Sequence, residues 1–229
     1  MTISVWIDVP DVAGSSRYGR LLSEADSVEA QRIRDPAMRL SLIASRALLR
    51  RVATEFGISL PSTIPRRCPA CGSRVHGPPV LADHLFTSIS RRTTLVAVAV
   101  SDRPVGIDVE DREAAIPLSA AVFSDDERRW LESASSSDSV WMWTAKEAVG
   151  KLSGWGLIGA DAVGVSPRRG SLWSEAVTAH GSAAVVRELA ATSRHVMTLA
   201  SYVPSTVRIS PTSQMEEEGR PFSQIYSVG

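Results

Sequence analysis

Lysine is scarce in this sequence. Only two of its 25 cationic residues are lysine, Lys146 and Lys151, and the others are arginine. Such a bias is typical of a genome's coding preference, which acts on every basic position alike. Against that background, two lysines five residues apart indicate that a function retains them.

Cysteine, net charge and long apolar runs are also scarce, and each absence excludes a class of protein. Two cysteines do not make a disulfide framework, so a reducing cytoplasm is expected. The 25 basic residues balance 25 acidic ones, which argues against a general nucleic-acid binder. No apolar run approaches the roughly 20 residues of a membrane span. The opening residues also lack the pattern of a secretory signal, so no membrane partner is expected.

The 229 residues are enough for one large domain or two smaller halves. Hydrophobic patterning predicts strands at residues 3–8, 85–90, 95–100, 105–110, 161–165, 183–188 and 195–202. It predicts helices at residues 24–34, 37–56, 124–133 and 138–152. We expect an α+β protein of two related halves, 1–103 and 104–203, each a small, mainly antiparallel sheet with a long helix. Residues 204–229, where periodicity fades, are expected to form a weakly ordered tail.

The strand at 105–110 places two carboxylates on one face. Side chains alternate along a strand, so Asp108 and Glu110 share the face of Gly106, opposite three apolar residues. Their Cα atoms lie roughly 7 Å apart, which lets both approach one hard cation such as Mg²⁺. Gly106 is expected to leave room for a ligand. The plainer interpretation is an edge strand with two solvated acids.

The helix at 138–152 carries a second group of polar residues. Trp143, Glu147 and Lys151 are spaced four residues apart and share one face, with Lys146 beside them. A carboxylate between two lysines suits a metal ligand with phosphate-binding neighbours. The plainer interpretation is an exposed Glu147–Lys151 pair, which contributes only about 0.3–0.5 kcal/mol.

Three sequence blocks follow one another in a fixed order. They are Val-Gly-Ile-Asp-Val-Glu at 105–110, Phe-Ser-x-x-Glu at 123–127 and Trp-x-x-Lys-Glu-Ala-x-x-Lys at 143–151. Together they resemble the Sfp-type 4′-phosphopantetheinyl transferases, whose two signature motifs are the first and last blocks. Fainter matches upstream are Arg46, the run Cys-Pro-Ala-Cys-Gly at 68–72 followed by His76-Gly77, and Ile89-Ser90.

The resemblance implies two similar α/β halves with coenzyme A and Mg²⁺ in the cleft between them. The family transfers 4′-phosphopantetheine from coenzyme A to a serine of an acyl or peptidyl carrier protein, as holo-[acyl-carrier-protein] synthases do. The other product is adenosine 3′,5′-bisphosphate. A cytoplasmic enzyme, often monomeric, with a role in secondary metabolism is expected.

The resemblance also implies roles for individual residues. By motif position, Asp108, Glu110 and Glu147 hold the metal. The serine hydroxyl needs a base, for which Glu147 is the first choice and Glu127 the second, with Lys151 facing the phosphates. The positions expected to contact coenzyme A are Arg46, Pro78, Ser90, Arg91, Asp108, Lys146 and Lys151. The basic helices of the first half, which could instead meet an acidic partner, add Arg39 and Arg50 to this set.

The sequence departs from the family at two of these positions. Pro78 stands where many members have lysine, and Arg91 stands where many have histidine. Arginine still donates to a phosphate, but its reach and geometry differ. The metal motifs are therefore intact, whereas the half that binds the nucleotide is altered.

Cys68, Cys71 and His76 resemble part of a zinc site. A closed structural site takes four ligands, and no second cysteine pair exists. His84 is a possible fourth ligand, but it opens a predicted strand. The preferred interpretation is a turn packed close to a ligand-binding loop, ahead of zinc or redox chemistry.

Two alternatives to the transferase remain open. The changes at Pro78 and Arg91 are compatible with a non-catalytic relative that binds a carrier protein or a nucleotide. Acids on a strand with a nearby lysine also occur in metal-dependent nucleases. Those usually place lysine two residues after the second acid, where this chain has Arg112.

Overall fold

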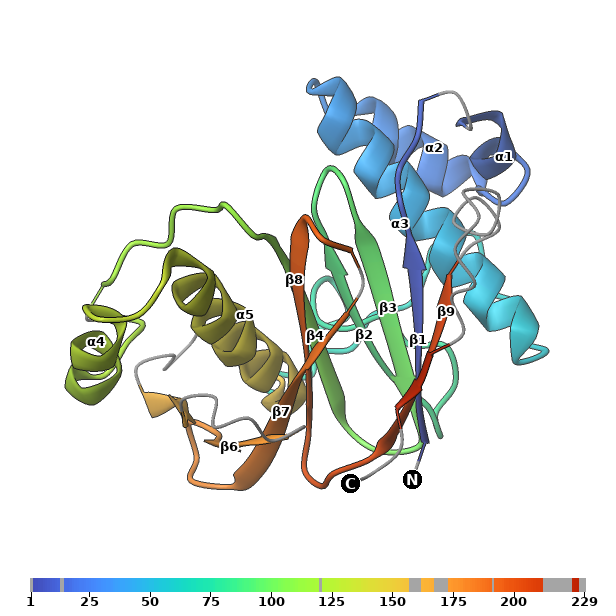
Figure 1. The fold of residues 1–229 in the computed structure, drawn as a ribbon. Coiled ribbons are helices and arrows are strands. Elements are labelled where there is room, and N and C mark those ends of the chain that lie inside the picture. Colours follow the sequence, from blue (N-terminus) through green and yellow to red (C-terminus); the bar gives the residue numbers. More distant parts are fainter. Residues whose placement is uncertain are drawn as a thin grey trace.

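Two five-stranded sheets form the centre of the protein, in a computed structural model (Figure 1). The structure describes residues 2–12, 15–119, 121–156, 162–166, 173–190, 192–211 and 224–226. The first sheet has the order β10-β9-β1-β3-β2 and contains β1 (Thr2–Asp8), β2 (Phe86–Arg91), β3 (Val96–Ser101), β9 (Thr206–Pro211) and β10 (Gln224–Tyr226). The second has the order β4-β8-β7-β6-β5 and contains β4 (Val105–Asp111), β5 (Gly164–Val165), β6 (Ser174–Val177), β7 (Ala183–Leu189) and β8 (His195–Ser201).

Five described helices flank the sheets. They are α1 (Ser15–Gly19), α2 (Glu24–Gln31), α3 (Pro36–Glu55), α4 (Asp125–Leu131) and α5 (Ser136–Ser153). The long helices α3 and α5 lie on opposite sides, with the sheets between them (Figure 1). None of the described helices combines the length and apolar character needed to cross a membrane. The expected α+β class is confirmed, and the predicted elements are present with ends displaced by a few residues.

The apolar face shared by both sheets forms a continuous core. Its members from the first sheet include Ile3, Val5, Ile7, Ala97 and Ala99, and those from the second include Val105, Ile107, Val109, Met197 and Leu199. All are at most 5% exposed, so the two sheets pack face to face. Burial on this scale is the main stabilising contribution to such a fold.

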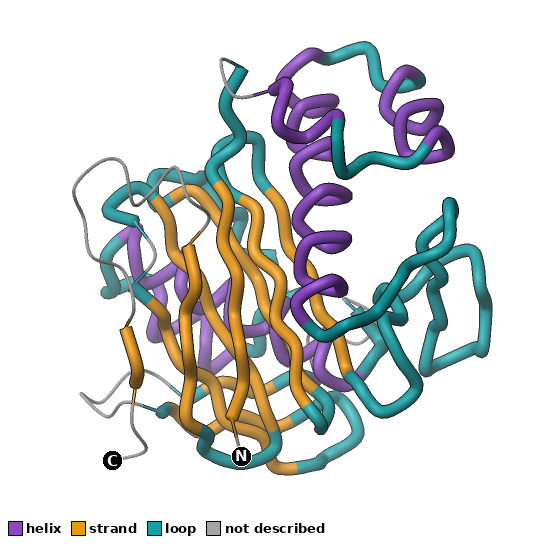
Figure 2. The backbone as a smooth tube through the Cα atoms, turned by 90° about the vertical axis from the view of Figure 1, so that its right-hand side faces the viewer, coloured by secondary structure: helices purple, strands orange, loops and turns teal. Residues whose placement is uncertain are grey.

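Helix α3 covers the outer face of the first sheet. The Asp35 side chain caps its first turn and Pro36 occupies a position where no amide hydrogen is needed. Leu49 and Val52 are fully buried against β1 and β3. Figure 2 shows the helix running beside the strands.

Helix α5 covers the outer face of β4, and a glycine allows the close approach. A Cβ atom at Gly106 would lie 1.9 Å from the carbonyl oxygen of Ala148 and 2.7 Å from the amide nitrogen of Leu152. The expectation that Gly106 leaves room for a ligand is therefore wrong, because the backbone of α5 fills that space.

The sheets meet along β2 and β4, which lie side by side (Figure 1). Here serine side chains of β2 act as acceptors for the backbone of β4. The Ile107 amide donates to the Ser88 hydroxyl at 3.0 Å, and the Val109 amide donates to the Ser90 hydroxyl at 3.2 Å. The acidic residues of β4 thus lie at the boundary between the sheets.

The predicted tail contains an ordered strand. Thr206–Pro211 form β9, which pairs parallel to β1 in the first sheet. Val207 and Ile209 are at most 1% exposed. Because they are two residues apart, both side chains lie on the same face of β9, and their burial in the core stabilises the strand. The weakly ordered tail predicted from residue 204 is wrong for this segment, whereas residues 212–223 and 227–229 lie outside the described part of the chain. The division at residues 103 and 104 stays a prediction, as does the similarity of the two halves.

Candidate active site

Asp108 and Glu110 project from β4 toward α5, which carries Glu147. Both strand carboxylates are buried, with 6% and 7% exposure. The apolar residues that alternate with the polar face of β4, which are Val105, Ile107 and Val109, face the core that the sheets share. The predicted alternation of faces along this strand is therefore confirmed, and it brings acids from two elements to one place.

Basic side chains contact both strand carboxylates. The Lys151 ammonium donates to Asp108 Oδ1 at 2.6 Å and to the Ile107 carbonyl at 3.1 Å. The Ser90 hydroxyl donates to the same Asp108 oxygen at 2.8 Å. The guanidinium of Arg92 lies 2.6 Å from Glu110 Oε1. Each strand carboxylate is thus paired with a cationic side chain.

Glu147 lies in a strongly acidic setting. Burial, reinforced by the negative charge of Asp108, raises its pKa to about 7 against the opposing effect of Lys151. Glu110 adds to the same shift. Burial also raises the pKa of Glu110 above its usual range, although Arg92 opposes this. The negative charges of Asp108 and Glu110 thus add to burial in disfavouring the ionised form of Glu147.

The chemistry of these three donors fits Mg²⁺. Carboxylate oxygens are its preferred protein ligands, and no soft donor lies among them. Their oxygens do not all lie within 4.8 Å of one another, since among the described residues only a cysteine–histidine group meets that distance. Holding one ion therefore requires these side chains to move closer together.

Two adjoining pockets open next to the carboxylates. The larger, of about 580 Å³, is lined by Lys151, Ser88 and Ile89 and by residues of the loop at 66–78. The smaller, of about 260 Å³, is lined by Ser90 and Ile89 of β2 and by three arginines. Because Ile89 and Arg66 line both, the two pockets adjoin each other along β2.

The smaller pocket is strongly cationic. Its lining contains Arg46, Arg66 and Arg91 and one carboxylate, Glu29. Arg46 makes a bidentate contact with Glu29, at 2.7 Å for the shortest pair. Burial, aided by the charge of Arg46, lowers the pKa of both Arg66 and Arg91. Crowded guanidinium groups of this kind attract phosphate, which they bind in a bidentate manner.

Lys146 and Glu127 do not lie at this site. The Lys146 side chain is fully buried, and its ammonium donates to Glu127 Oε2 at 2.6 Å and to the Val163 carbonyl. Glu127 also accepts from the amides of Ser124 and Val165. The pair ties α4 and β5 to α5, so the structure supports neither a phosphate contact for Lys146 nor a base role for Glu127.

Arg39 and Arg50, both expected to contact coenzyme A, serve the fold instead. Arg39 donates to the Ile33 carbonyl at 2.9 Å, at the connection between α2 and α3. Arg50 donates to Asp26 at 2.6 Å and to the Ser62 carbonyl at 2.6 Å. Its guanidinium therefore ties α3 to α2 and to the loop that follows α3.

The remaining predicted positions line the two pockets. Pro78 borders the larger pocket, and Ser90 and Arg91 border the smaller one. Arg66 lines both pockets, although the sequence did not single it out. Its position two residues before Cys68 was the available signal, because the cysteine loop was already expected near a ligand.

The comparison with known families agrees with this arrangement. A model described as the 4′-phosphopantetheinyl transferase superfamily matches residues 104–200. The matched segment runs from β4 to all but the last residue of β8, and it contains the three carboxylates and Lys151. A search of curated proteins found no match. The family resemblance drawn from the two motifs is thus confirmed for residues 104–200, at the level of the 4′-phosphopantetheinyl transferase superfamily.

Proposed function

We propose that the protein transfers 4′-phosphopantetheine from coenzyme A to a serine hydroxyl of an acyl or peptidyl carrier protein, with Mg²⁺ as the cofactor. The superfamily match supports phosphopantetheine transfer in general. One observation carries the finer proposal. Asp108 and Glu110 of β4, with Glu147 and Lys151 of α5, lie beside two adjoining pockets, of which the smaller is lined by arginines.

The arginine-lined pocket would bind the phosphate groups of the nucleotide. Arg66 and Arg91 lie in its lining without an ion pair to any described carboxylate, whereas Arg46 shares its charge with Glu29. Lys151, at the border of the larger pocket, would contact the pyrophosphate. These contacts hold the donor so that its pyrophosphate lies beside the carboxylates, which is the positioning that phosphoryl transfer requires.

Asp108, Glu110 and Glu147 would hold the metal ion. Bound there, Mg²⁺ supplies charge compensation for the pyrophosphate oxygens during transfer. Lys151, whose ammonium has three donors, would turn toward the substrate as the metal ion takes its place at Asp108. Glu147 would accept the serine proton, because Glu127 is bound within the fold.

The reaction breaks the bond between the pyrophosphate's bridging oxygen and the phosphorus that bears pantetheine. The serine oxygen forms the new bond to that phosphorus, and adenosine 3′,5′-bisphosphate leaves with the bridging oxygen. The serine proton passes to Glu147. No redox partner is needed, so the two substrates account for every atom transferred.

A non-catalytic relative is the second candidate. Lys151 and Arg92 already neutralise Asp108 and Glu110 without a metal ion. Pro78 also replaces a lysine that many relatives of the Sfp type carry. A protein of this kind would bind coenzyme A or a carrier protein without turnover.

Mass spectrometry of apo-carrier proteins distinguishes the two candidates. Carriers of the fatty-acid, polyketide and nonribosomal-peptide types are incubated with the protein, coenzyme A and Mg²⁺. A gain of the 4′-phosphopantetheine mass on one of them supports the transferase, and a carrier whose serine is changed to alanine is the control. Binding by calorimetry with no mass gain on any carrier would favour the non-catalytic relative.

A further inference from the structure

The loop at 65–80 is folded into a compact hairpin that closes on its own cysteines. Its two arms pair through backbone hydrogen bonds, from the Arg67 amide to the Pro78 carbonyl and from the Val80 amide to the Pro65 carbonyl. At the tip, the Gly72 amide donates to the Cys68 carbonyl at 2.8 Å. Main-chain bonds therefore hold most of the hairpin, and the Arg66 side chain adds a bond across the arms to the Gly77 carbonyl at 2.8 Å.

The returning arm passes directly over the first cysteine. Gly77 has a φ of 103°, and a Cβ there would lie 2.6 Å from the Cα of Cys68. Only glycine permits this approach and this conformation. As a result His76, just before the glycine, is brought to the two cysteines at the tip.

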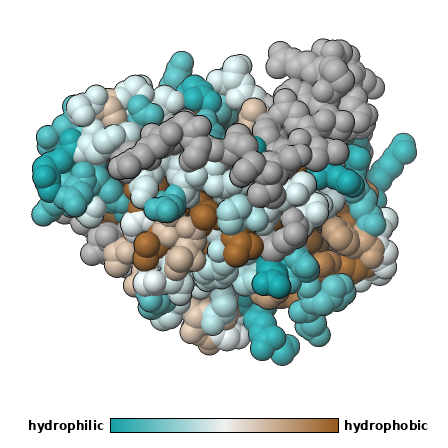
Figure 3. Space-filling model, turned by 60° about the horizontal axis from the view of Figure 1, so that its bottom comes forward, coloured by the Kyte–Doolittle hydropathy of each residue, from teal (hydrophilic) through white to brown (hydrophobic). Residues whose placement is uncertain are grey.

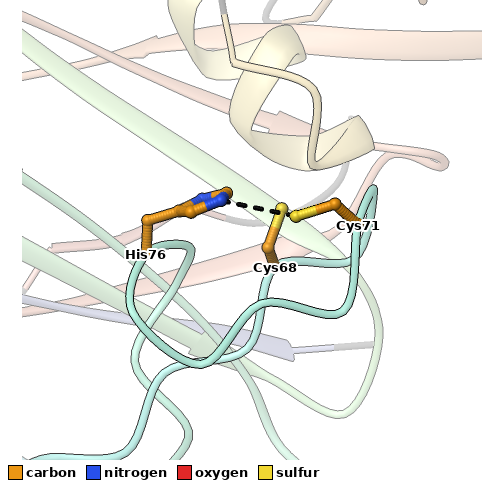
Figure 4. A group of neighbouring side chains, drawn as sticks. All are labelled: Cys68, Cys71 and His76. Atoms are coloured by element: carbon orange, nitrogen blue, oxygen red, sulfur yellow. Dashed lines mark hydrogen bonds between the residues drawn. The ribbon is translucent and has the colours of Figure 1, made fainter.

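The three side chains point toward one another (Figure 4). The sulfurs of Cys68 and Cys71 and a ring nitrogen of His76 all lie within 4.8 Å of one another. The distance from Cys71 Sγ to His76 Nε2 is 3.4 Å. Zinc bonds of about 2.3 Å to sulfur and 2.0–2.1 Å to nitrogen, at a tetrahedral angle, would place such a pair roughly 3.5 Å apart.

We propose that Cys68, Cys71 and His76 bind one Zn²⁺ ion. Two thiolates and an imidazole form a soft donor set that selects zinc over Mg²⁺, which the carboxylates of the active site prefer. Three protein ligands leave one tetrahedral position for water. His84, the fourth ligand weighed from the sequence, does not join the group among the described residues.

The site forms part of the wall of the larger pocket. Cys68, Cys71 and His76 line it together with Lys151 and Trp155. The same hairpin abuts the end of α5, since a Cβ at Gly154 would lie 2.0 Å from the ring of Pro69. Zinc would therefore stabilise the wall that faces Lys151. This last step, the effect on the substrate pocket, rests on the proposed function.

The metal content of the full-length protein tests the zinc site directly. The protein is produced without a histidine tag in zinc-supplemented medium, passed over a desalting column and measured by inductively coupled plasma mass spectrometry. Roughly one zinc per chain is expected. Cys71→Ser and His76→Gln are each expected to lower zinc affinity at least about tenfold, whereas His84→Gln, the matched control, retains it.

Cobalt substitution gives a readout that does not depend on the variants folding. The wild-type protein loaded with Co²⁺ is expected to show thiolate-to-cobalt charge-transfer bands and the intense visible bands of tetrahedral cobalt. Three results would each overturn the proposal. The wild-type cobalt spectrum could lack thiolate bands, the wild-type protein could be free of zinc, or Cys71→Ser and His76→Gln could retain as much zinc as the wild type.

The measurements of zinc and cobalt stand apart from the transfer assay. If zinc is bound but no carrier gains phosphopantetheine, the proposed function fails and the metal site holds. If transfer occurs and zinc is absent, the opposite is true. Where both hold, removing zinc by a chelator is expected to raise KM for coenzyme A more than it lowers kcat, and an unchanged KM would overturn the role in the pocket wall.

Discussion

The ammonium of Lys151 lies 2.6 Å from a carboxylate oxygen of Asp108 and so links α5 to β4. Lys151 is one of only two lysines in the chain, and its charge meets a carboxylate that is 6% exposed. The other lysine is buried in a separate pair with Glu127. The two lysines thus have different roles: Lys151 belongs to the site, and Lys146 belongs to the core.

Neutralising the acids of the proposed metal site is expected to stop transfer without unfolding the protein. Asp108→Asn and Glu147→Gln should each lower kcat/KM by about 100-fold or more, because both remove a negative ligand from the proposed cation. Initial rates at several Mg²⁺ concentrations measure this. Asp126→Asn, at an exposed position on α4, is the control and should be unaffected. Rapid transfer by either site variant would remove the proposed metal site.

Removing charge from the cationic pocket is expected to weaken donor binding. Arg66→Gln and Arg91→Gln should each raise KM for coenzyme A by roughly tenfold with a smaller change in kcat, since a charge-assisted hydrogen bond contributes about 1.5–3 kcal/mol. Steady-state kinetics measure the two constants. Arg34→Gln, an exposed arginine outside both pocket linings, provides the comparison. Equal KM values in all three variants would contradict a nucleotide site here.

Lys146→Met is expected to destabilise the protein and leave donor binding intact. Losing one partner of a buried ion pair leaves Glu127 charged and uncompensated, which costs about 3–5 kcal/mol in the free energy of unfolding. Urea denaturation measures the loss. Lys146→Met combined with Glu127→Leu should recover part of it. A Lys146→Met variant of normal stability with a raised KM for coenzyme A would instead return Lys146 to the substrate site.

Gly106→Ala is expected to disturb the active site by displacing α5 from β4. The new methyl group would meet the Ala148 carbonyl of α5, so the helix must shift, at a cost of about 1–3 kcal/mol. Because Glu147 and Lys151 lie on that helix, activity should fall as well. Gly19→Ala, where an added Cβ meets nothing within 4 Å, serves as the control. Thermal denaturation and transfer rates give the two readouts.

His195 is expected to make the stability of the fold depend on pH. Burial lowers its pKa, assisted by Arg194, although Asp111 opposes the shift. The unfolded chain then binds the proton more tightly, so the stabilisation is complete above the ordinary histidine pKa of about 6.5 and declines as pH falls below it. Denaturation midpoints at pH 7.5 and pH 5.5 measure the decline.

His195→Gln should reduce that decline, whereas His84→Gln, at an exposed site, should leave it unchanged. Thr94 and Thr192 contact the two ring nitrogens of His195 at 2.8 Å and 2.6 Å. Glutamine keeps part of this hydrogen bonding and removes the titration. An equal pH dependence in both variants would show that His195 is not its source.

Local pattern predicted the carboxylate strand and the helices well. Asp108 and Glu110 alternate with apolar residues that pack into the core shared by the two sheets. This alternation can be recognised from the sequence of the strand alone, without knowing which strands it pairs with. The surface drawn in Figure 3 shows small hydrophobic patches bordered by hydrophilic residues. The sequence, with 44% hydrophobic and 22% charged residues, has the composition of an ordinary globular protein. Short-range rules therefore sufficed for the elements that carry the proposed metal ligands.

Contacts between distant segments were beyond such rules. Lys146 and Lys151 lie on the same helix, but their side chains point in different directions. The motif alone did not reveal that Lys146 points into the core and pairs with Glu127, nineteen residues earlier. The cysteine–histidine group depends on the close approach of Gly77 to Cys68, which spacing does not predict. Pairing of β9 with β1 joins segments from opposite ends of the chain.

That pairing constrains how the protein is made. β1 lies between β3 and β9, so its outer edge has no partner until the ribosome has released residues 206–211. An open strand edge is a template for association with other chains. The nascent N-terminal portion therefore spends most of translation with an unprotected edge, and a version truncated before residue 206 would keep that edge permanently.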